Sequence, residues 1–575
     1  MENTEDDICV VGIGNVLPDA NNSNEFWKNL MNGHSSIRNA PNHRLNSELY
    51  YNEKASELTT YTRLAGTIDD EVLKEFAAKN KLNNRPFHRL FLSTLMATRE
   101  AIEHLEKTLL SSKKTDIYMG AMVADTSLYK KSFLNEKEFY RNELKGKQKT
   151  NYYNLIAQYF DYNFGEYSKE DYAYASYTLH MIKHELKING EIGIFDAACA
   201  SSLAAIDHAV NKLKSHEADL IITGGMEADI TPKAYAAFTC VNGLSRRPAA
   251  PFDSTTDGLN LGEGSVVLVL QRLKDAKRNR NHIYGIIKSI SSSSDGRSSS
   301  LFAPTKNGQV RALTKAYKKL DKSKVRFIEC HGTGTTLGDQ TELSSTGFVF
   351  DKYKIPIGSV KFNIGHTRGA AGAAGVLKSL LIFKNSIVPP SPYFKNYIDK
   401  EKSNNLFINK KAYQLEPISS GDLIGVSSFG FGGINYHLTI EAIDDKCLFK
   451  PSVKKKIKKI AIIGKETCST DKDIEKINNW ANYNIPPISI KQKQIDISHL
   501  KALNTVSLAI KKLGVPISIF NAEKIGVISA IPTTIQTAFN SFKRTSYLEI
   551  VHGLTEISSD LKELSNKRWS SFDKI

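Results

Sequence analysis

Short apolar runs that end in glycine-rich or small-residue turns recur along most of this chain. They are found at residues 8–14, 220–225, 266–270, 325–329 and 423–426. Helical patterns fill the intervals between them, at residues 88–106, 307–320 and 370–384. Strands that alternate with helices predict an α/β fold in which helices cover both faces of a sheet.

Length and composition exclude several classes of protein. The 575 residues are enough for more than one domain or for one large one. There is no apolar stretch of the roughly 20 residues that a membrane span needs, and the acidic start is unlike a signal peptide. The six cysteines are scattered, with no pair or cluster at metal-binding spacing. We therefore expect a cytoplasmic protein with reduced thiols and no bound metal.

The formal net charge of +16 raises the question of an acidic partner. The basic residues are spread along the chain, and the densest cluster is at 454–459. None of the motifs typical of nucleic-acid binding accompanies that cluster. The sequence therefore predicts no nucleic-acid partner, and the charge is compatible with an acidic protein partner.

Cys199 lies in a setting that favours reactivity. It follows a predicted strand and precedes a predicted helix, and its neighbours Ala197, Ala198, Ala200 and Ser201 are all small. A helix N-terminus stabilises a thiolate, so the position predicts a lowered pKa for this thiol. The arrangement resembles a nucleophile elbow that is built on cysteine.

Two histidines follow predicted strands at turns of small residues. His331 begins the run His-Gly-Thr-Gly-Thr, and His366 ends the run Lys-Phe-Asn-Ile-Gly-His. Imidazoles beside a thiolate can donate N–H bonds to an enolate or oxyanion and move protons near neutral pH. The glycine turn at 429–433 offers further backbone N–H groups for an oxyanion hole.

These segments, in this order, resemble the β-ketoacyl synthases of fatty acid and polyketide synthesis. The resemblance covers about residues 8 to 442 and rests on 196–203, 331–335, 361–366 and 429–433. It implies a thiolase-like fold of five layers, αβαβα, with an N-terminal half at 1–255 and a C-terminal half at 256–443. The stretch 282–309 is most similar to ketosynthases of the polyunsaturated-fatty-acid and enediyne polyketide type.

The resemblance also implies roles for the reactive groups. Cys199 would carry the acyl chain as a thioester. His331 and His366 would assist decarboxylation of a malonyl group and stabilise the enolate. Lys361 would orient the histidines, and Glu342 would support that cluster from behind.

Further positions of the family motifs concern the substrate. The backbone N–H groups of Cys199 and Phe431 would hold the thioester oxygen, and the Phe431 ring would gate entry. Thr333 and Thr335 would bind the pantetheine arm. The family's substrates ride on the phosphopantetheine of a separate acyl carrier protein, so no cofactor is expected on this chain.

Two positions depart from the family pattern. Phe362 occupies a place that is usually small or polar, which predicts an altered pocket near Lys361. Arg368 is unusual in its charge. The sequence contains no acyltransferase elbow, reductase fingerprint or carrier motif, so we expect an acyltransferase that acts in trans.

The tail repeats the opening of the chain. After a basic linker at 444–459, residues 460–464 echo 8–12, and two further echoes follow in the same order. Residues 460–575 thus resemble the truncated start of a second synthase-like, chain-length-factor-like segment. We expect it to pack on the main domain or on a partner.

Three readings compete at this point. The first is a condensing enzyme that works as a homodimer or with a synthase-like partner. The second is a non-elongating or chain-length-factor-like partner, which usually lacks the cysteine. The third is a thiolase, which would need a second cysteine near 430–433, where none is present.

Overall fold

The computed structural model describes residues 3–443, with gaps at 56–58, 83–87, 113, 123–174, 297–302 and 404, and beyond them only Thr505. The predicted linker at 444–459 and the predicted repeat at 460–575 therefore lie outside the described residues, apart from Thr505. None of the described helices has the length and apolar character needed to cross a membrane.

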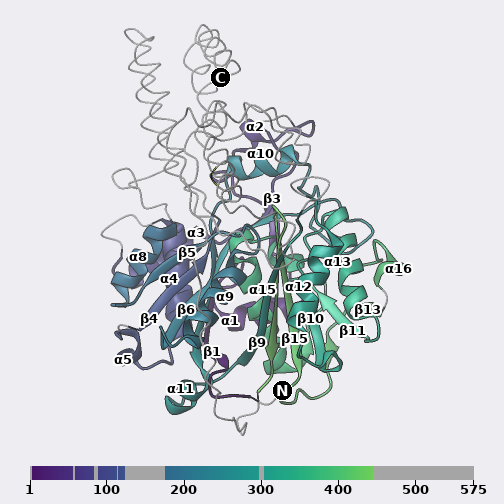
Figure 1. Cartoon of the computed structure of the whole chain (residues 1–575). Helices are drawn as coiled ribbons and strands as arrows, with labels where there is room; N and C mark the ends of the chain where they lie inside the picture. The colour runs from purple at the N-terminus through teal and green to yellow at the C-terminus, as the bar shows by residue number, and fades with distance from the viewer. Residues whose placement is uncertain are drawn as a thin grey trace, which may run out of the picture.

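Eleven strands form one mixed sheet that consists of two halves (Figure 1). In spatial order, the N-terminal half contains β5 (Ile192–Phe195), β4 (Thr115–Gly120), β6 (Leu220–Glu227), β8 (Gly264–Arg272) and β1 (Ile8–Val16). The C-terminal half continues with β9 (Gly285–Ser294), β16 (Ile434–Glu441), β15 (Leu423–Gly430), β10 (Val325–Glu329), β11 (Ile355–Gly358) and β13 (Leu406–Phe407). The halves join where β1 pairs antiparallel with β9, with Ile8 opposite Ile287.

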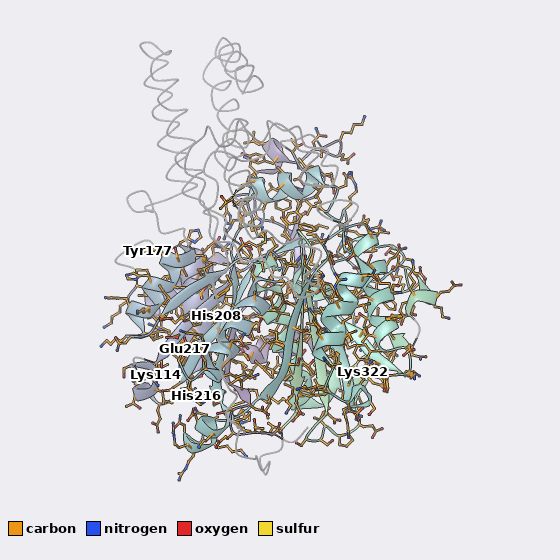
Figure 2. The ribbon with its side chains drawn as sticks, viewed as in Figure 1. Lys114, Tyr177, His208, His216, Glu217 and Lys322 are labelled. Atoms are coloured by element: carbon orange, nitrogen blue, oxygen red, sulfur yellow. The ribbon has the colours of Figure 1, made fainter. Side chains whose placement is uncertain are left out.

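Helices divide the molecule into layers. One outer layer contains α4 (Arg89–Ile102) and α8 (Ala175–Glu185), and the other contains α12 (Lys306–Ala316) and α13 (Thr336–Val349). The middle layer contains α9 (Ser201–Lys214) and α15 (Ala371–Asn385), which pack on each other and on strands of both halves (Figure 1). In Figure 2, His208 of α9 and Tyr177 of α8 mark the N-terminal half, and Lys322 marks the C-terminal half. The predicted five-layered α/β fold is confirmed.

The apolar runs of the sequence are unbroken because both faces of the central strands are buried. In β1, Ile8 and Val10 belong to one hydrophobic core, whereas Cys9 and Val11 belong to the core on the opposite face. Strand β8 alternates in the same way between the two cores. Successive side chains of a strand point to opposite faces, so one continuous apolar run supplies two layers.

The shorter elements connect these layers or surround the site. They are α1 (Ser23–Met31), β2 (Ile37–Asn39), α2 (Ser47–Tyr50), β3 (Leu64–Gly66), α3 (Asp70–Lys79), α5 (Lys107–Leu110), α10 (Pro232–Cys240), β7 (Leu261–Gly262), α11 (Leu273–Arg278), η2 (Lys322–Lys324), α14 (Lys361–Ile364), η3 (Arg368–Ala370), β12 (Ile387–Val388), α16 (Lys400–Ser403) and β14 (Tyr413–Gln414).

The two middle helices begin beside each other. The Ala373 N–H of α15 donates a hydrogen bond to the Ser202 hydroxyl of α9 at 3.0 Å. Gly372 permits this approach, since a Cβ there would lie 2.7 Å from the Leu203 side chain. The segments that carry Cys199 and His366 lead into these two helices, so the fold brings them together.

Candidate active site

Cys199 lies on a tight turn between β5 and α9. Ala198 adopts a left-handed conformation with φ 51°, and α9 begins two residues after the cysteine, at Ser201. The Ala197 N–H donates to the Ser201 hydroxyl at 2.9 Å, and the Ser428 hydroxyl donates to the Cys199 carbonyl at 2.6 Å. These bonds hold the turn in place, and Cys199, which is only 3% exposed, lines a pocket.

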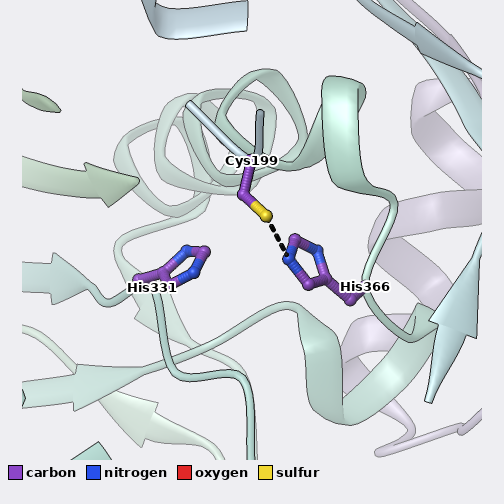
Figure 3. Close-up of side chains that lie close together, drawn as sticks. All are labelled: Cys199, His331 and His366. Carbon is purple, nitrogen blue, oxygen red and sulfur yellow. Dashed lines mark hydrogen bonds between the residues drawn. The ribbon is translucent and has the colours of Figure 1, made fainter. Parts of the chain in front are cut away.

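His366 faces the sulfur directly. Its Nε2 lies 3.1 Å from Cys199 Sγ (Figure 3). The backbone N–H of His366 donates to the Asn260 carbonyl at 2.8 Å, and the backbone N–H of Gly262 donates to the His366 carbonyl at 3.0 Å. The Arg368 N–H donates to His366 Nδ1 at 3.1 Å. Because Nδ1 accepts this bond, the neutral ring carries its proton on Nε2, which points toward Cys199.

His331 completes the group from the end of β10. Glu342 accepts the N–H groups of His331 and Gly332, each at 2.7 Å, and Lys361 Nζ donates to the His331 carbonyl at 2.5 Å. The His331 ring lies 5.4 Å from the His366 ring, centroid to centroid. The reactive atoms of the cysteine and the two histidines lie within 4.8 Å of one another (Figure 3).

The remaining predicted residues lie at the pocket wall. Thr333 and Thr335 line the pocket, with their hydroxyl oxygens 3.0 Å apart. The Phe431 ring is 36% exposed and lies 5.9 Å from the Phe238 ring, centroid to centroid. The backbone N–H groups of Phe431 and of Cys199 itself act to lower the pKa of the Cys199 thiol. Both N–H groups that the sequence predicts as oxyanion donors therefore influence the sulfur, and their oxyanion role stays a prediction.

Four polar side chains that line the pocket, Asp339 among them, were not predicted from the sequence. Asp295, Gln309 and Asn435 also line it, and Asn435 Nδ2 donates to Asp295 Oδ1 at 2.8 Å. In the sequence, the segment with Asp295 indicates only the similarity to one group of ketosynthases. Its contribution to the wall depends on the pairing of β9 with β16, which places Ser294 opposite Ile434.

The acid–base properties differ from those predicted. Burial raises the pKa of Cys199 to about 11, although Lys361, Arg368 and the Phe431 N–H all act to lower it. The prediction of a lowered thiol pKa is therefore wrong, because the loss of hydration outweighs the favourable charges and dipoles.

The histidines also depart from expectation. Burial, helped by the charge of Lys361, holds the pKa values of His331 and His366 well below the ordinary range. The expectation that they move protons near neutral pH is therefore wrong for this resting site. Both rings are neutral there, and a neutral imidazole offers one N–H donor and one acceptor nitrogen.

The side chain of Phe362, which departs from the family pattern, does not line the pocket. Its side chain is 1% exposed and packs in a hydrophobic core with Phe252, Ile328 and Ile357. It is absent from the pocket lining among the described residues. The prediction of an altered pocket near Lys361 is wrong, because the side chain points into the core.

Comparison with known proteins identifies the family. A model of the N-terminal domain of β-ketoacyl synthases matches residues 5–276, and a model of the C-terminal domain matches residues 284–395. The chain belongs to the β-ketoacyl synthase family, the ketosynthases that act as acyltransferase-type condensing enzymes.

Curated relatives are much longer than this chain. It is 29% identical over 463 residues to a component of the polyunsaturated fatty acid synthase from Thraustochytrium sp., a match that covers 76% of this chain and 16% of the relative. It is 30% identical over 463 residues to polyketide synthase PksN from Bacillus subtilis, which covers 76% of this chain and 8% of the relative. The chain thus spans less than a fifth of either protein.

Solved structures share the fold. A ketosynthase from module 6 of the bacillaene synthase of Bacillus subtilis matches with a TM-score of 0.62 and 24% identity, over 86% of this chain and 80% of that one. A structure described as PfaC keto synthase–chain length factor matches with a TM-score of 0.67 and 25% identity, over 81% of this chain and 51% of that one. The likeness supports the thiolase-like architecture.

Proposed function

We propose that this chain is a β-ketoacyl-[acyl-carrier-protein] synthase that extends an acyl group held on Cys199. The observation that carries the proposal is the approach of Cys199 Sγ to His366 Nε2 at 3.1 Å, with His331 beside them. A non-elongating or chain-length-factor-like partner is not favoured, because it would not need this set of groups.

The first half-reaction is acyl transfer. The Cys199 sulfur attacks the carbonyl carbon of an acyl thioester on a carrier protein, and the carrier thiol leaves with the proton that Cys199 releases. The developing oxyanion accepts bonds from the N–H groups of Cys199 and Phe431. Thr333 and Thr335 bind the pantetheine arm at the pocket wall.

The second half-reaction is decarboxylative condensation. A malonyl thioester loses CO₂, and the electrons of the broken C–C bond form an enolate whose oxygen accepts N–H bonds from His331 and His366. The enolate carbon attacks the acyl carbon on Cys199, and the thiolate is expelled as the β-ketoacyl carrier forms. Neutral imidazoles suit this role, because they act as donors and the step needs no strong base.

The partners follow from this chemistry. Acyl carrier protein delivers both acyl groups on its own phosphopantetheine, and an acyltransferase acting in trans loads the malonyl group. We further propose that the chain works as a dimer, either with itself or with a synthase-like partner, and that it is cytoplasmic. The division into halves at 1–255 and 256–443 stays a prediction, and it differs from the division of the sheet, in which β8 (Gly264–Arg272) lies among the N-terminal strands.

The test follows carrier-bound products by intact mass. The parent chain, incubated with acyl-carrier and malonyl-carrier proteins, is expected to yield a β-ketoacyl carrier, and Cys199→Ala is expected to yield none. Cys330→Ala is the matched control, since Cys330 is also buried but does not line the pocket. His331→Ala should lose about 10²-fold or more of the condensation and retain part of the acylation of Cys199. Condensation by Cys199→Ala would refute the proposal.

A further inference from the structure

Arg368, two residues after His366, carries a buried charge that acts on both His366 and Cys199. Its side chain is 4% exposed, and it does not line the pocket. One guanidinium nitrogen lies 3.1 Å from Glu227 Oε1, another lies 3.5 Å from Asp229 Oδ2, and the group also donates to the Asp229 carbonyl. A buried cation of this kind persists only where its partners are fixed.

The backbone of Arg368 is as unusual as its side chain. Its φ is 42°, in the left-handed region that costs free energy for any residue other than glycine. This conformation aims the Arg368 N–H at His366 Nδ1, the bond that leaves the proton on Nε2. The ion pairs to Glu227 and Asp229 act on the same residue, so they hold the strained turn in place.

The turn at Arg368 also packs tightly against β6, the strand that ends at Glu227. Arg368 begins η3, which packs on β6, and Glu227 is the last residue of that strand. Gly225 makes the approach possible, since a Cβ there would lie 2.6 Å from Ala370 Cα. The cation and its carboxylate are therefore parts of one rigid contact.

We propose that Arg368 is a positioning residue that fixes the proton-bearing nitrogen of His366 toward Cys199 and, through its buried charge, favours the thiolate of Cys199. The proposal deepens the proposed function, because the same thiol would be acylated there. It concerns the free thiol, however, and can be tested without any acyl substrate.

The charges around Cys199 and His366 determine in which direction each substitution should shift the pKa of the thiol. Cys199 experiences the cations of Lys361 and Arg368, both of which lower its pKa, and it faces the neutral rings of His331 and His366.

Around Arg368, burial raises the pKa of Glu227 to about 7, and the charge of Arg368 opposes this rise. Glu263 and Tyr235 also experience the charge of Arg368, and Asp229 in turn faces His88. At pH 8 both Glu227 and Arg368 are charged, so they act on the thiol in opposite directions.

The experiment measures the alkylation of Cys199 by iodoacetamide against pH in the full chain. Iodoacetamide is uncharged, and mass mapping separates Cys199 from the exposed Cys240. Arg368→Gln is expected to move the profile upward by about one pH unit, which is about a tenfold slower alkylation at pH 8. Arg368→Lys keeps the charge and should lie between this variant and the parent.

Glu227→Gln provides a test of the opposite sign. It removes the anion and leaves the cation, so the profile should move downward and alkylation at pH 8 should become faster. A role in folding alone would slow or disturb both variants alike. Arg272→Gln is the matched control, because Arg272 is a buried cation paired with Asp219 and Asp275 that does not line the pocket.

The outcomes are distinct. Shifts of opposite sign in Arg368→Gln and Glu227→Gln support the proposal, whereas shifts of the same sign, or none, overturn it. If Arg368→Gln fails to fold, Glu227→Gln and Arg368→Lys still decide the matter. Opposite shifts in a chain that forms no β-ketoacyl product would refute the proposed function and leave this inference intact.

Discussion

The substitution Glu342→Gln tests how the site holds His331. Glu342 is 2% exposed, and its two carboxylate oxygens accept the N–H groups of His331 and Gly332 at 2.7 Å each. Glutamine has the same shape but only one oxygen. One of the two N–H groups must then face the amide NH₂, which is itself a donor.

The magnitude follows from these two bonds. A hydrogen bond to a charged group contributes about 1.5–3 kcal/mol, and a buried N–H without an acceptor costs about 1–3 kcal/mol. Removing the buried carboxylate relieves part of its desolvation, so we expect a net loss of about 2–3 kcal/mol. If the loss falls on the placement of the His331 ring in the transition state, decarboxylation slows roughly 30- to 150-fold.

The assay compares two reactions in one preparation. Loss of CO₂ from a malonyl carrier is followed by intact mass, and alkylation of Cys199 is measured alongside it. Glu342→Gln should slow the decarboxylation without slowing the alkylation, since it removes an anion of the pocket and breaks no bond to Cys199. Glu441→Gln is the control, because Glu441 is also buried but lies at the end of β16 and pairs at 3.5 Å with Lys288 of β9. Decarboxylation at the parent rate in Glu342→Gln would refute this reasoning.

Three further outcomes are expected. Because burial raises the pKa of Cys199 to about 11, its alkylation should rise about tenfold per pH unit from neutrality and level off only above about pH 11; a plateau near pH 8 would contradict this. Phe431→Ala removes a half-exposed ring and keeps the backbone N–H, so bulky thiol reagents should gain more in rate than iodoacetamide, and equal gains would argue against a gate. Light scattering should give twice the mass of the chain, whereas a stable monomer at micromolar concentration would exclude a homodimer.

The layered fold was predictable because the apolar runs encode it directly. The run at 8–14 became β1 (Ile8–Val16), the run at 325–329 became β10 with the same bounds, and the helix expected at 88–106 became α4 (Arg89–Ile102). Helix α4 begins one residue later than expected because His88 caps its start by accepting the Leu90 N–H. Such features are local, and local patterns reveal them.

The site was only partly predictable. The motifs located Cys199, His331 and His366, but no local pattern indicates that Glu227, at the end of β6, faces Arg368 from a distant segment. The prediction of a lowered pKa for the Cys199 thiol is wrong for the same reason. A helix N-terminus is visible in the sequence, whereas the burial of the sulfur depends on every element that surrounds it.

The reactivity of Cys199 is therefore a property of the whole fold. Burial excludes water from the place where we propose that an enolate forms, and the same burial disfavours the thiolate. The groups that oppose this penalty come from separate parts of the chain: Lys361 from α14, Arg368 from η3, and the N–H of Phe431 from the turn after β15. Removing one of these groups leaves the others in place. Each single substitution should therefore change the pKa of the Cys199 thiol by only part of their combined effect. The nucleophile motif accordingly predicts which atom reacts, while distant charges and backbone dipoles determine how readily its thiol ionises.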